Sequence, residues 1–274
     1  MSISEKLTQL AQIKEDIKQA IIDKGQEATD DMTQYSTLIG NISGGGGSDE
    51  DFVAVVSGTA VSPTIPNGAT AIRSYLFQNV TTLSSINLPN SITSIEKYAF
   101  YSCTDLVLTS LPDTVTSIET YAFYDCKNLA LTSLPSSLTS MAGYAFRGCT
   151  NLALTSLPDG LTRINQNTFQ YCKNLALTSL PDGITSIDNY AFSTCEKLKT
   201  IRLSSSLNYI GSYAFTGCTG LTEITFKSKP TTLNSTAFSG CTKLTSIKVP
   251  WSQGEVSGAP WGATNATITY NYTE

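Results

Sequence analysis

The feature that most constrains this chain is a strict repeat of 23 residues. Leu-Pro pairs begin at Leu88, Leu111, Leu134, Leu157 and Leu180, and Ile65-Pro66 precedes them by the same distance. Leu203, Phe226 and Val249-Pro250 continue the count, so eight units occupy residues 65–248 without an insertion. The segment CKNLALTSLP occurs at 126–135 and returns unchanged at 172–181, two units later. Self-similarity at a period of about 20–29 residues predicts a solenoid.

Two columns of apolar side chains recur in a constant register within the repeat. They consist of Phe77, Phe100, Phe123, Phe146, Phe169, Phe192, Phe215 and Phe238, and of Leu83, Leu106, Leu129, Leu152, Leu175, Leu198, Leu221 and Leu244. A single unit cannot bury its apolar side alone, whereas stacked units make these columns one continuous core. Strands of neighbouring units would lie about 4.8 Å apart, so eight rungs would span about 38 Å. We predict a β-rich solenoid of the leucine-rich repeat class, with an N-terminal α-helical segment and β caps.

Units such as LPNSITSIEKYAFYSCTDL and SSLNYIGSYAFTGCTGLTEI carry a more specific signature, I-x-x-Y-A-F-x-x-C-x-x-L. In this they resemble the BspA-like leucine-rich repeats of bacterial surface proteins, and the resemblance covers residues 65–248. It implies a right-handed solenoid with a sheet on one side, used for adhesion and partner binding. It implies no particular ligand.

The seven cysteines form a third column. They are Cys103, Cys126, Cys149, Cys172, Cys195, Cys218 and Cys241, and Val80 holds the position in the first unit. Stacked rungs would bring neighbouring cysteines near bonding distance, so geometry alone permits disulfides. The odd number, the valine and the lack of a histidine or C-x-x-C pair favour a reduced, buried column instead. We predict neither a metal site nor a cofactor.

Four consecutive units depart from the L-x-x-I-x-L ending that Leu198 and Ile201 exemplify. Their inward position holds Thr109, Thr132, Thr155 and Thr178, and an aliphatic residue appears one place earlier, at Leu108, Leu131, Leu154 and Leu177. A one-residue shift moves a side chain to the other face of a strand. The leucines would therefore form an exposed apolar stripe, a candidate binding surface. The alternative is a local bulge that returns them to the core and turns the threonines outward.

Two further columns are candidate binding surfaces. On the expected sheet face lie Ser110, Ser133, Ser156, Ser179 and Arg202, which could meet glycans or protein backbone or could simply be solvated. On the expected convex side lie Tyr75, Tyr98, Tyr121, Tyr144, Tyr190 and Tyr213, interrupted by Asn167 and followed by Thr236. Tyrosine offers a large contact area at low entropic cost. These tyrosines could serve recognition or packing between rungs.

The segments outside the repeat suggest a modular chain. Residues 51–64 alternate sufficiently to form an N-terminal β cap, and residues 249–274 form a C-terminal cap in which Trp251 and Trp261 cover the last coil. Residues 44–50 form a glycine-rich, flexible tether. Residues 1–43 form a helical head for attachment or oligomerisation, with an apolar stripe at Ile3, Leu7, Leu10, Ile13, Ile17 and Ile21.

The helical head bears a short resemblance of its own. Its segments IKEDIKQAIIDKG and YSTLIGNI are similar to the helical openings of some phage or prophage tail-associated proteins. A lone amphipathic helix has no core against which to bury its apolar stripe. We expect it to form a homo-oligomer or to dock on another protein, rather than to fold back on the second helix.

Composition excludes several classes of function. Lys and Arg number 17 against 22 Asp and Glu, and an acidic chain without a basic run argues against nucleic acid as a partner. Histidine is absent, and neither a G-x-S-x-G motif nor a phosphate-binding loop occurs, so we do not expect an enzyme. No apolar stretch predicts a membrane span, and the N-terminus does not resemble a signal peptide.

These observations predict a non-catalytic adhesion or receptor-binding protein, associated with a phage tail, that binds a protein or a cell-surface glycan. The alternatives are a bacterial surface adhesin of the BspA-like type and a self-assembling scaffold. Either adhesive role predicts an extracellular or virion-associated location.

Overall fold

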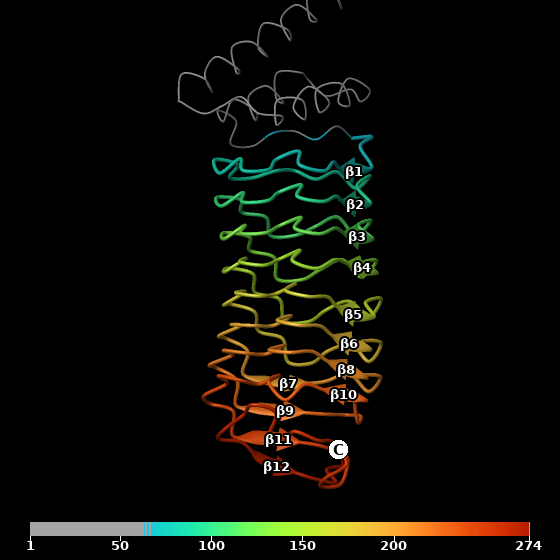
Figure 1. Cartoon of the computed structure of the whole chain (residues 1–274). Coiled ribbons are helices and arrows are strands. Elements are labelled where there is room, and N and C mark those ends of the chain that lie inside the picture. The colour runs from blue at the N-terminus through green and yellow to red at the C-terminus, as the bar shows by residue number, and fades with distance from the viewer. Residues whose placement is uncertain (1–62, 64, 66, 274) are drawn as a thin grey trace, which may run out of the picture.

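The computed structural model describes residues 63, 65 and 67–273, and this part of the chain is a solenoid of stacked laps (Figure 1). The predicted head at 1–43, the tether at 44–50 and, apart from Pro63, the N-terminal cap at 51–64 lie outside the described residues. The spacing of one lap is 23 residues, as the sequence repeat predicts. Chain topology therefore follows directly from the sequence period.

Each lap contributes a two-residue strand to one side of the solenoid. These strands are β1 (Ala71–Ile72), β2 (Ser94–Ile95), β3 (Ser117–Ile118), β4 (Ser140–Met141), β5 (Arg163–Ile164), β6 (Ser186–Ile187), β8 (Tyr209–Ile210) and β10 (Thr232–Leu233). All pair in parallel, and the second residue of each is buried. Pairing stops between β4 and β5, so the column forms two sheets, β1-β2-β3-β4 and β5-β6-β8-β10.

A second strand column occupies the C-terminal laps. It consists of β7 (Thr200–Arg202), β9 (Glu223–Thr225), β11 (Ser246–Lys248) and β12 (Thr267–Thr269), which form one parallel sheet. Its first three strands belong to the units that keep the L-x-x-I-x-L ending, and Ile201, Ile224 and Ile247 point into the core. In these three units the regular ending forms a regular strand, whereas the first unit, which also keeps the ending, has only a single bridge at Asn87.

The core contains the predicted phenylalanine column. The rings stack on one another with centroids 5.3 Å apart for Phe77 and Phe100 and 5.9 Å apart for Phe146 and Phe169. Offset stacking at such distances is favourable and adds to the benefit of burial. The structure confirms this column and the leucine column as the shared interior of the laps.

The cysteine column is also buried, and its seven thiols are unpaired. Each Sγ donates a hydrogen bond to the carbonyl oxygen of the phenylalanine 26 residues earlier, for example from Cys103 to Phe77 at 2.9 Å and from Cys195 to Phe169 at 3.2 Å. The thiol is therefore a second donor to a carbonyl of the preceding lap that already accepts a backbone amide, as Phe77 accepts from Val80. Burial raises the pKa of the Cys103 thiol to about 12, so the column stays protonated at neutral pH.

Two tryptophans close the C-terminal end of the core. Trp261 is fully buried and follows Phe238 by 23 residues, so it occupies the next position of the phenylalanine column. Trp251 packs edge-on against Phe226 with centroids 5.1 Å apart and against Trp261 at 6.3 Å. Near the end of this segment, β12 pairs with β11. Within residues 63–273, no helix is long and apolar enough to cross a membrane.

Candidate binding surfaces

The leucine stripe is not a binding surface, because all four leucines are buried. Leu131 and Leu154 are 0% exposed, Leu177 is 1% exposed and Leu108 is 8% exposed. Thr109, Thr132, Thr155 and Thr178 are the exposed residues instead. The structure thus contains the bulge, and the exposed stripe is the wrong alternative.

The physical reason is a pair of consecutive outward residues in each of these laps. In the sequence Leu108-Thr109-Ser110-Leu111, both leucines point inward and both hydroxyl residues point outward. The backbone amides of Ala130, Ala153 and Ala176 each donate to the carbonyl of the leucine 22 residues earlier, at 3.1 Å. One inter-lap bond per lap therefore remains where a regular strand is lost, while the leucine keeps its place in the core.

The bulge creates a surface made of hydroxyl groups. Its two rows are Thr109, Thr132, Thr155 and Thr178, and Ser110, Ser133, Ser156 and Ser179, and all of these residues are exposed. Arg202 is exposed at the end of the serine row and forms a backbone bridge with Ser179. This hydroxyl face carries no charged side chain in its two rows and is uniform along four laps.

The tyrosine column packs ring against ring and remains half-exposed. Neighbouring ring centroids lie 5.1 Å apart for Tyr75 and Tyr98, 4.8 Å for Tyr98 and Tyr121, and 4.7 Å for Tyr121 and Tyr144. Asn167 interrupts the column, after which Tyr190 and Tyr213 stack at 5.2 Å. The side chains therefore pack between rungs and still present their outer parts to solvent.

The backbone of these tyrosines is left-handed. The φ angle is 59° at Tyr98 and 61° at Tyr121, and Asn167 has the same conformation with φ 57°. Asparagine and glycine adopt this conformation with less steric cost than a bulky residue. Tyrosine nevertheless occupies most of the column, so its side chain compensates for an unfavourable backbone.

A second aromatic row lies beside the first. Tyr101 and Tyr124 stack at 4.7 Å, and Tyr101 also contacts Tyr98 at 5.4 Å. Arg147 continues this row, with its guanidinium 4.9 Å from the Tyr124 ring centroid and 5.1 Å from that of Tyr171. Partial desolvation, together with repulsion from neighbouring phenols, raises the pKa of Tyr98 and Tyr121. The phenols are therefore neutral at physiological pH, and the surface is aromatic with a cationic guanidinium at Arg147.

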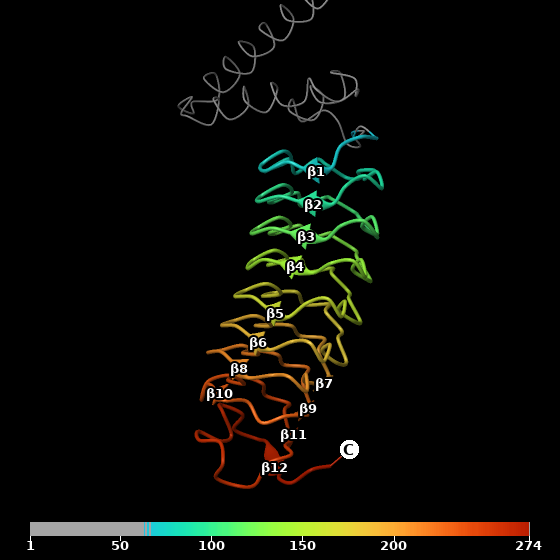
Figure 2. The same cartoon turned by 90° about the vertical axis from the view of Figure 1, so that its right-hand side faces the viewer.

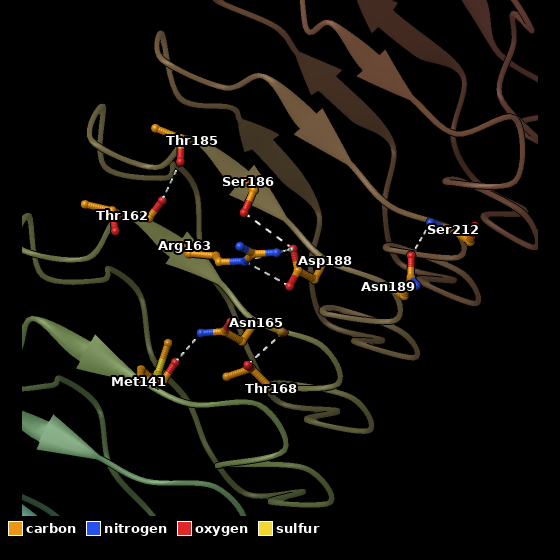
Figure 3. Close-up of polar contacts among 10 residues, drawn as sticks. All are labelled: Met141, Thr162, Arg163, Asn165, Thr168, Thr185, Ser186, Asp188, Asn189 and Ser212. Carbon is orange, nitrogen blue, oxygen red and sulfur yellow. Dashed lines mark hydrogen bonds and ion pairs between the residues drawn. The ribbon is translucent and has the colours of Figure 1, made fainter.

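The unit at residues 157–179 breaks the regularity of the column. At the position of Glu96 and Glu119 it has Asn165, whose Nδ2 donates to the carbonyl oxygen of Met141 at 2.7 Å (Figure 3). In other laps a backbone amide makes this inter-lap bond, as from Glu119 to Ile95. The side chain thus replaces the missing ladder bond between β4 and β5. Laps from β5 onward are displaced sideways relative to those above (Figure 2).

A polar pocket lies on the C-terminal side of this break, over the laps of β5, β6 and β8. Its volume is about 330 Å³, and it is lined by Arg163, Gln166, Ser186, Asp188, Asn189 and Tyr209. We call it the junction pocket. Arg163, on β5, reaches the Asp188 carboxylate through Nε, 3.0 Å from Oδ2, and through Nη2, 3.0 Å from Oδ1 (Figure 3). This pairing raises the pKa of the Arg163 guanidinium and fixes the orientation of both groups.

The junction pocket could not be read from any single sequence motif. Arg163, Ser186 and Tyr209 are successive members of one column, as are Gln166 and Asn189 of another, because each lies 23 residues after the last. Arg163 and Tyr209 replace the serine found at Ser117 and Ser140 in the first of these columns. A comparison of departures from the repeat, column by column, could have found the pocket.

The described residues contain no group of three or more acidic or cysteine side chains placed to hold a metal ion. Several of their ionisable groups instead form pairs between neighbouring laps, such as Lys173 with Glu196 at 2.9 Å and Lys248 with Glu223 at 2.8 Å. What the surface offers chemically is therefore hydrogen bonding and aromatic contact.

Comparison with known proteins places this geometry in a family. The sequence model described as BspA type leucine rich repeat region matches residues 57–176 and 162–259, with six copies. The chain belongs to this family. No curated protein matches its sequence.

Solved structures resemble the BspA-type solenoid as well. A leucine-rich repeat protein from Bacteroides ovatus is 23% identical with a TM-score of 0.56, and the match covers 77% of this chain and 61% of that one. A leucine rich repeat protein of T. pallidum is 34% identical with a TM-score of 0.44, over 58% of this chain and 73% of that one. A leucine rich cell surface protein from Faecalibacterium prausnitzii is 23% identical with a TM-score of 0.40, over 78% and 79%. The Bacteroides ovatus structure shows a shared fold, and our chain spans 61% of its length.

Proposed function

We propose that this BspA-type protein is a non-catalytic adhesion protein that binds a protein or glycan on a cell surface. The observation that supports this most directly is the tyrosine column with its second aromatic row. Tyr98, Tyr121 and Tyr144 stand half-exposed at separations of 4.7–4.8 Å on a rigid scaffold. Aromatic side chains held in place before binding lose little entropy when a partner docks.

The mechanism is the sum of modest contacts along several laps. Four consecutive laps repeat the aromatic position at Tyr75, Tyr98, Tyr121 and Tyr144, so an extended partner meets the same chemistry at a regular interval along them. Multivalent presentation would multiply the strength of such contacts, because a second binding event becomes intramolecular. Self-association through the predicted head at residues 1–43 would supply that valency.

The test is binding of the labelled full chain to intact cells from a panel of bacterial and epithelial sources. The double variant Tyr98→Ser with Tyr121→Ser removes the centre of the column and should reduce binding about tenfold or more. Tyr272→Ser removes a half-exposed tyrosine near the C-terminal end and should bind like the parent chain. Equal binding by all three proteins would exclude the tyrosine column as the binding surface.

A second proposal concerns whether the protein is displayed on a phage particle or on a bacterial surface. The resemblance of IKEDIKQAIIDKG to tail-associated proteins favours a phage particle, whereas family membership favours a bacterial surface. Antibodies against the solenoid, applied to intact cells and to purified phage particles from an induced culture, separate the two. Sedimentation of the full chain tests the remaining alternative of a self-assembling scaffold, which requires growth beyond a defined oligomer.

A further inference from the structure

We propose that the junction pocket binds a single ring of a neutral saccharide. The proposal goes beyond the tyrosine column to a second, separate site, and it rests on the proposed function only in supposing that the protein meets glycans. The pocket opens beside the last tyrosine of the N-terminal stack, since Gln166 lines it and donates from Nε2 to the Tyr144 hydroxyl at 3.1 Å. A saccharide held there would lie next to the aromatic surface.

The pocket presents both donors and acceptors in fixed positions. Asn189 accepts a hydrogen bond from the Ser212 amide at Oδ1, at 2.8 Å, which orients its Nδ2 as a remaining donor. Arg163 uses Nε and Nη2 on Asp188, and Gln166 uses Nε2 on Tyr144. Nη1 of Arg163, Nδ2 of Asn189 and Oε1 of Gln166 have no hydrogen-bond partner among the residues that the structure describes.

This mixture of groups suits hydroxyl groups, which donate and accept at the same atom. A saccharide ring carries several adjacent hydroxyls, so one molecule can engage two donors and an acceptor together. The Tyr209 side chain, 37% exposed, adds an aromatic surface for the apolar face of a ring. The pocket therefore offers both kinds of contact that a sugar ring makes.

Charge and size narrow the class further. The pocket lining contains one positively charged side chain, Arg163, and one negatively charged side chain, Asp188. They form a bidentate ion pair, so the lining has no net charge. An anionic ligand that approached Arg163 would also lie close to the Asp188 carboxylate, and repulsion between the two negative charges would disfavour its binding. A volume of about 330 Å³ lies at the lower end for small-ligand pockets, about 300–1,000 Å³, and so matches one ring rather than a long chain.

The departures from the repeat also gather at this place. The segment CKNLALTSLP is identical at 126–135 and 172–181, so the chain tolerates uniform laps. The unit at 157–179 contains most of the second copy, yet it has Arg163 at a position where four of the other seven units have serine, and it has Gln166 where the neighbouring units have Gly143 and Asn189. Uniform laps need no such changes for packing, because Arg163 is exposed on the surface.

The experiment measures binding of soluble methyl glycosides to the full chain by ligand-observed NMR and calorimetry. The panel contains neutral methyl mannoside, galactoside, glucoside, fucoside and N-acetylglucosaminide, with sialic acid and acetate as anionic probes. A single ring should bind with a Kd of about 1 mM, from the affinity per atom of ordinary ligands. At least one neutral glycoside should bind.

The decisive variant is Arg163→Ser, which restores the residue found at Ser117, Ser140 and Ser186 and should leave folding unchanged. It should weaken binding of that glycoside about tenfold or more, because a charged donor is lost. Its control is Lys127→Thr, which removes the same charge from an exposed position and matches Thr104 and Thr150 of the repeat. The control should bind like the parent chain.

Three results would overturn the proposal: no neutral glycoside binds, Arg163→Ser binds as well as the parent, or only the anionic probes bind. Thermal unfolding of each variant shows whether it is folded, and Tyr209→Ser, again a return to the repeat residue, provides an independent second variant. The assay uses no cells. If the chain adheres to cells but binds no glycoside, the proposed function stands and this inference is wrong. If the chain binds a glycoside at the pocket but does not adhere to cells, this inference stands and the proposed function is wrong.

Discussion

Leu131 is one of four leucines that sit one position earlier than the repeat would place them, and it is 0% exposed. We predict that Leu131→Asp lowers the free energy of unfolding by about 4 kcal/mol or more, because a carboxylate would be buried without a partner. Chemical denaturation followed by circular dichroism measures the change. The loss of stability would arise because the side chain at position 131 points into the core.

The matched control for Leu131 is two residues away on the hydroxyl face. Ser133 is exposed, so Ser133→Asp should change the free energy of unfolding by less than about 0.5 kcal/mol. If Leu131→Asp were as stable as Ser133→Asp, the leucine could not lie in the core of the protein in solution.

The thiol of Cys103 gives a prediction for pH dependence. Burial raises its pKa from an ordinary 9.0 to about 12. Between these values the unfolded chain loses the proton while the folded chain retains it. The stabilisation is therefore complete below pH 9 and is lost as pH rises, by up to about 1.4 kcal/mol per pH unit.

We test this with Cys103→Val, which copies Val80 at the same position of the first unit. Between pH 8 and about pH 10.5 the parent should lose about 2 kcal/mol more stability than the variant, as measured by denaturant unfolding. The other ionisable groups titrate in both proteins, so their contributions cancel when the stability of the variant is subtracted from that of the parent. If the free energy of unfolding fell equally with pH in the parent and in Cys103→Val, the Cys103 thiol would not be shielded from solvent.

At the scale of elements, the join between β4 and β5 depends on one side chain. Asn165 donates to the Met141 carbonyl where a backbone amide serves in other laps. We predict that Asn165→Ala destabilises the protein by about 1–2 kcal/mol, because it leaves that carbonyl without its donor. Hydrogen exchange should report faster opening in β4 and β5 than in β1.

Asn151→Ala is the control for Asn165→Ala. Asn151 is exposed, and its Nδ2 lies 3.4 Å from Oδ1 of Asn128, a weak contact between surface side chains. Its loss should change stability by less than about 0.5 kcal/mol and leave exchange in β4 and β5 unaltered. Similar exchange rates in the two variants would mean that Asn165 does not hold the two sheets together.

The elements also show how far the sequence alone can lead. The 23-residue columns predicted the lap, the phenylalanine core and the buried cysteines, because stacking gives every lap the same environment. The direction of Leu108 and Thr109 was left open, because the periodic pattern does not say whether the backbone bulges. The junction pocket was missed, because Arg163, Asp188 and Tyr209 are unremarkable one at a time and meet only through stacking.

At the scale of the whole molecule, the repeat makes laps interchangeable. Stability in such a stack is approximately a sum over laps and their interfaces, so removal of whole laps should shorten the molecule without unfolding it. The two copies of CKNLALTSLP offer a natural place to test this. Deleting residues 126–171 joins Asp125 to Cys172 and restores the same ten-residue segment at the junction.

We predict that this deletion of 46 residues folds cooperatively. Small-angle scattering should show a rod shorter by about 9–10 Å, the height of two strand spacings, and the denaturant dependence of unfolding should fall with the surface buried. The shortened column would bring Tyr121 next to Tyr190 and so remove the interruption at Asn167. Because Arg163 and Gln166 are deleted, glycoside binding should be lost while Tyr75, Tyr98 and Tyr121 remain for cell binding. An aggregated or partly unfolded product would instead mean that the unit at 157–179 is a structural requirement of the stack, and that its irregular residues are there for folding rather than for recognition.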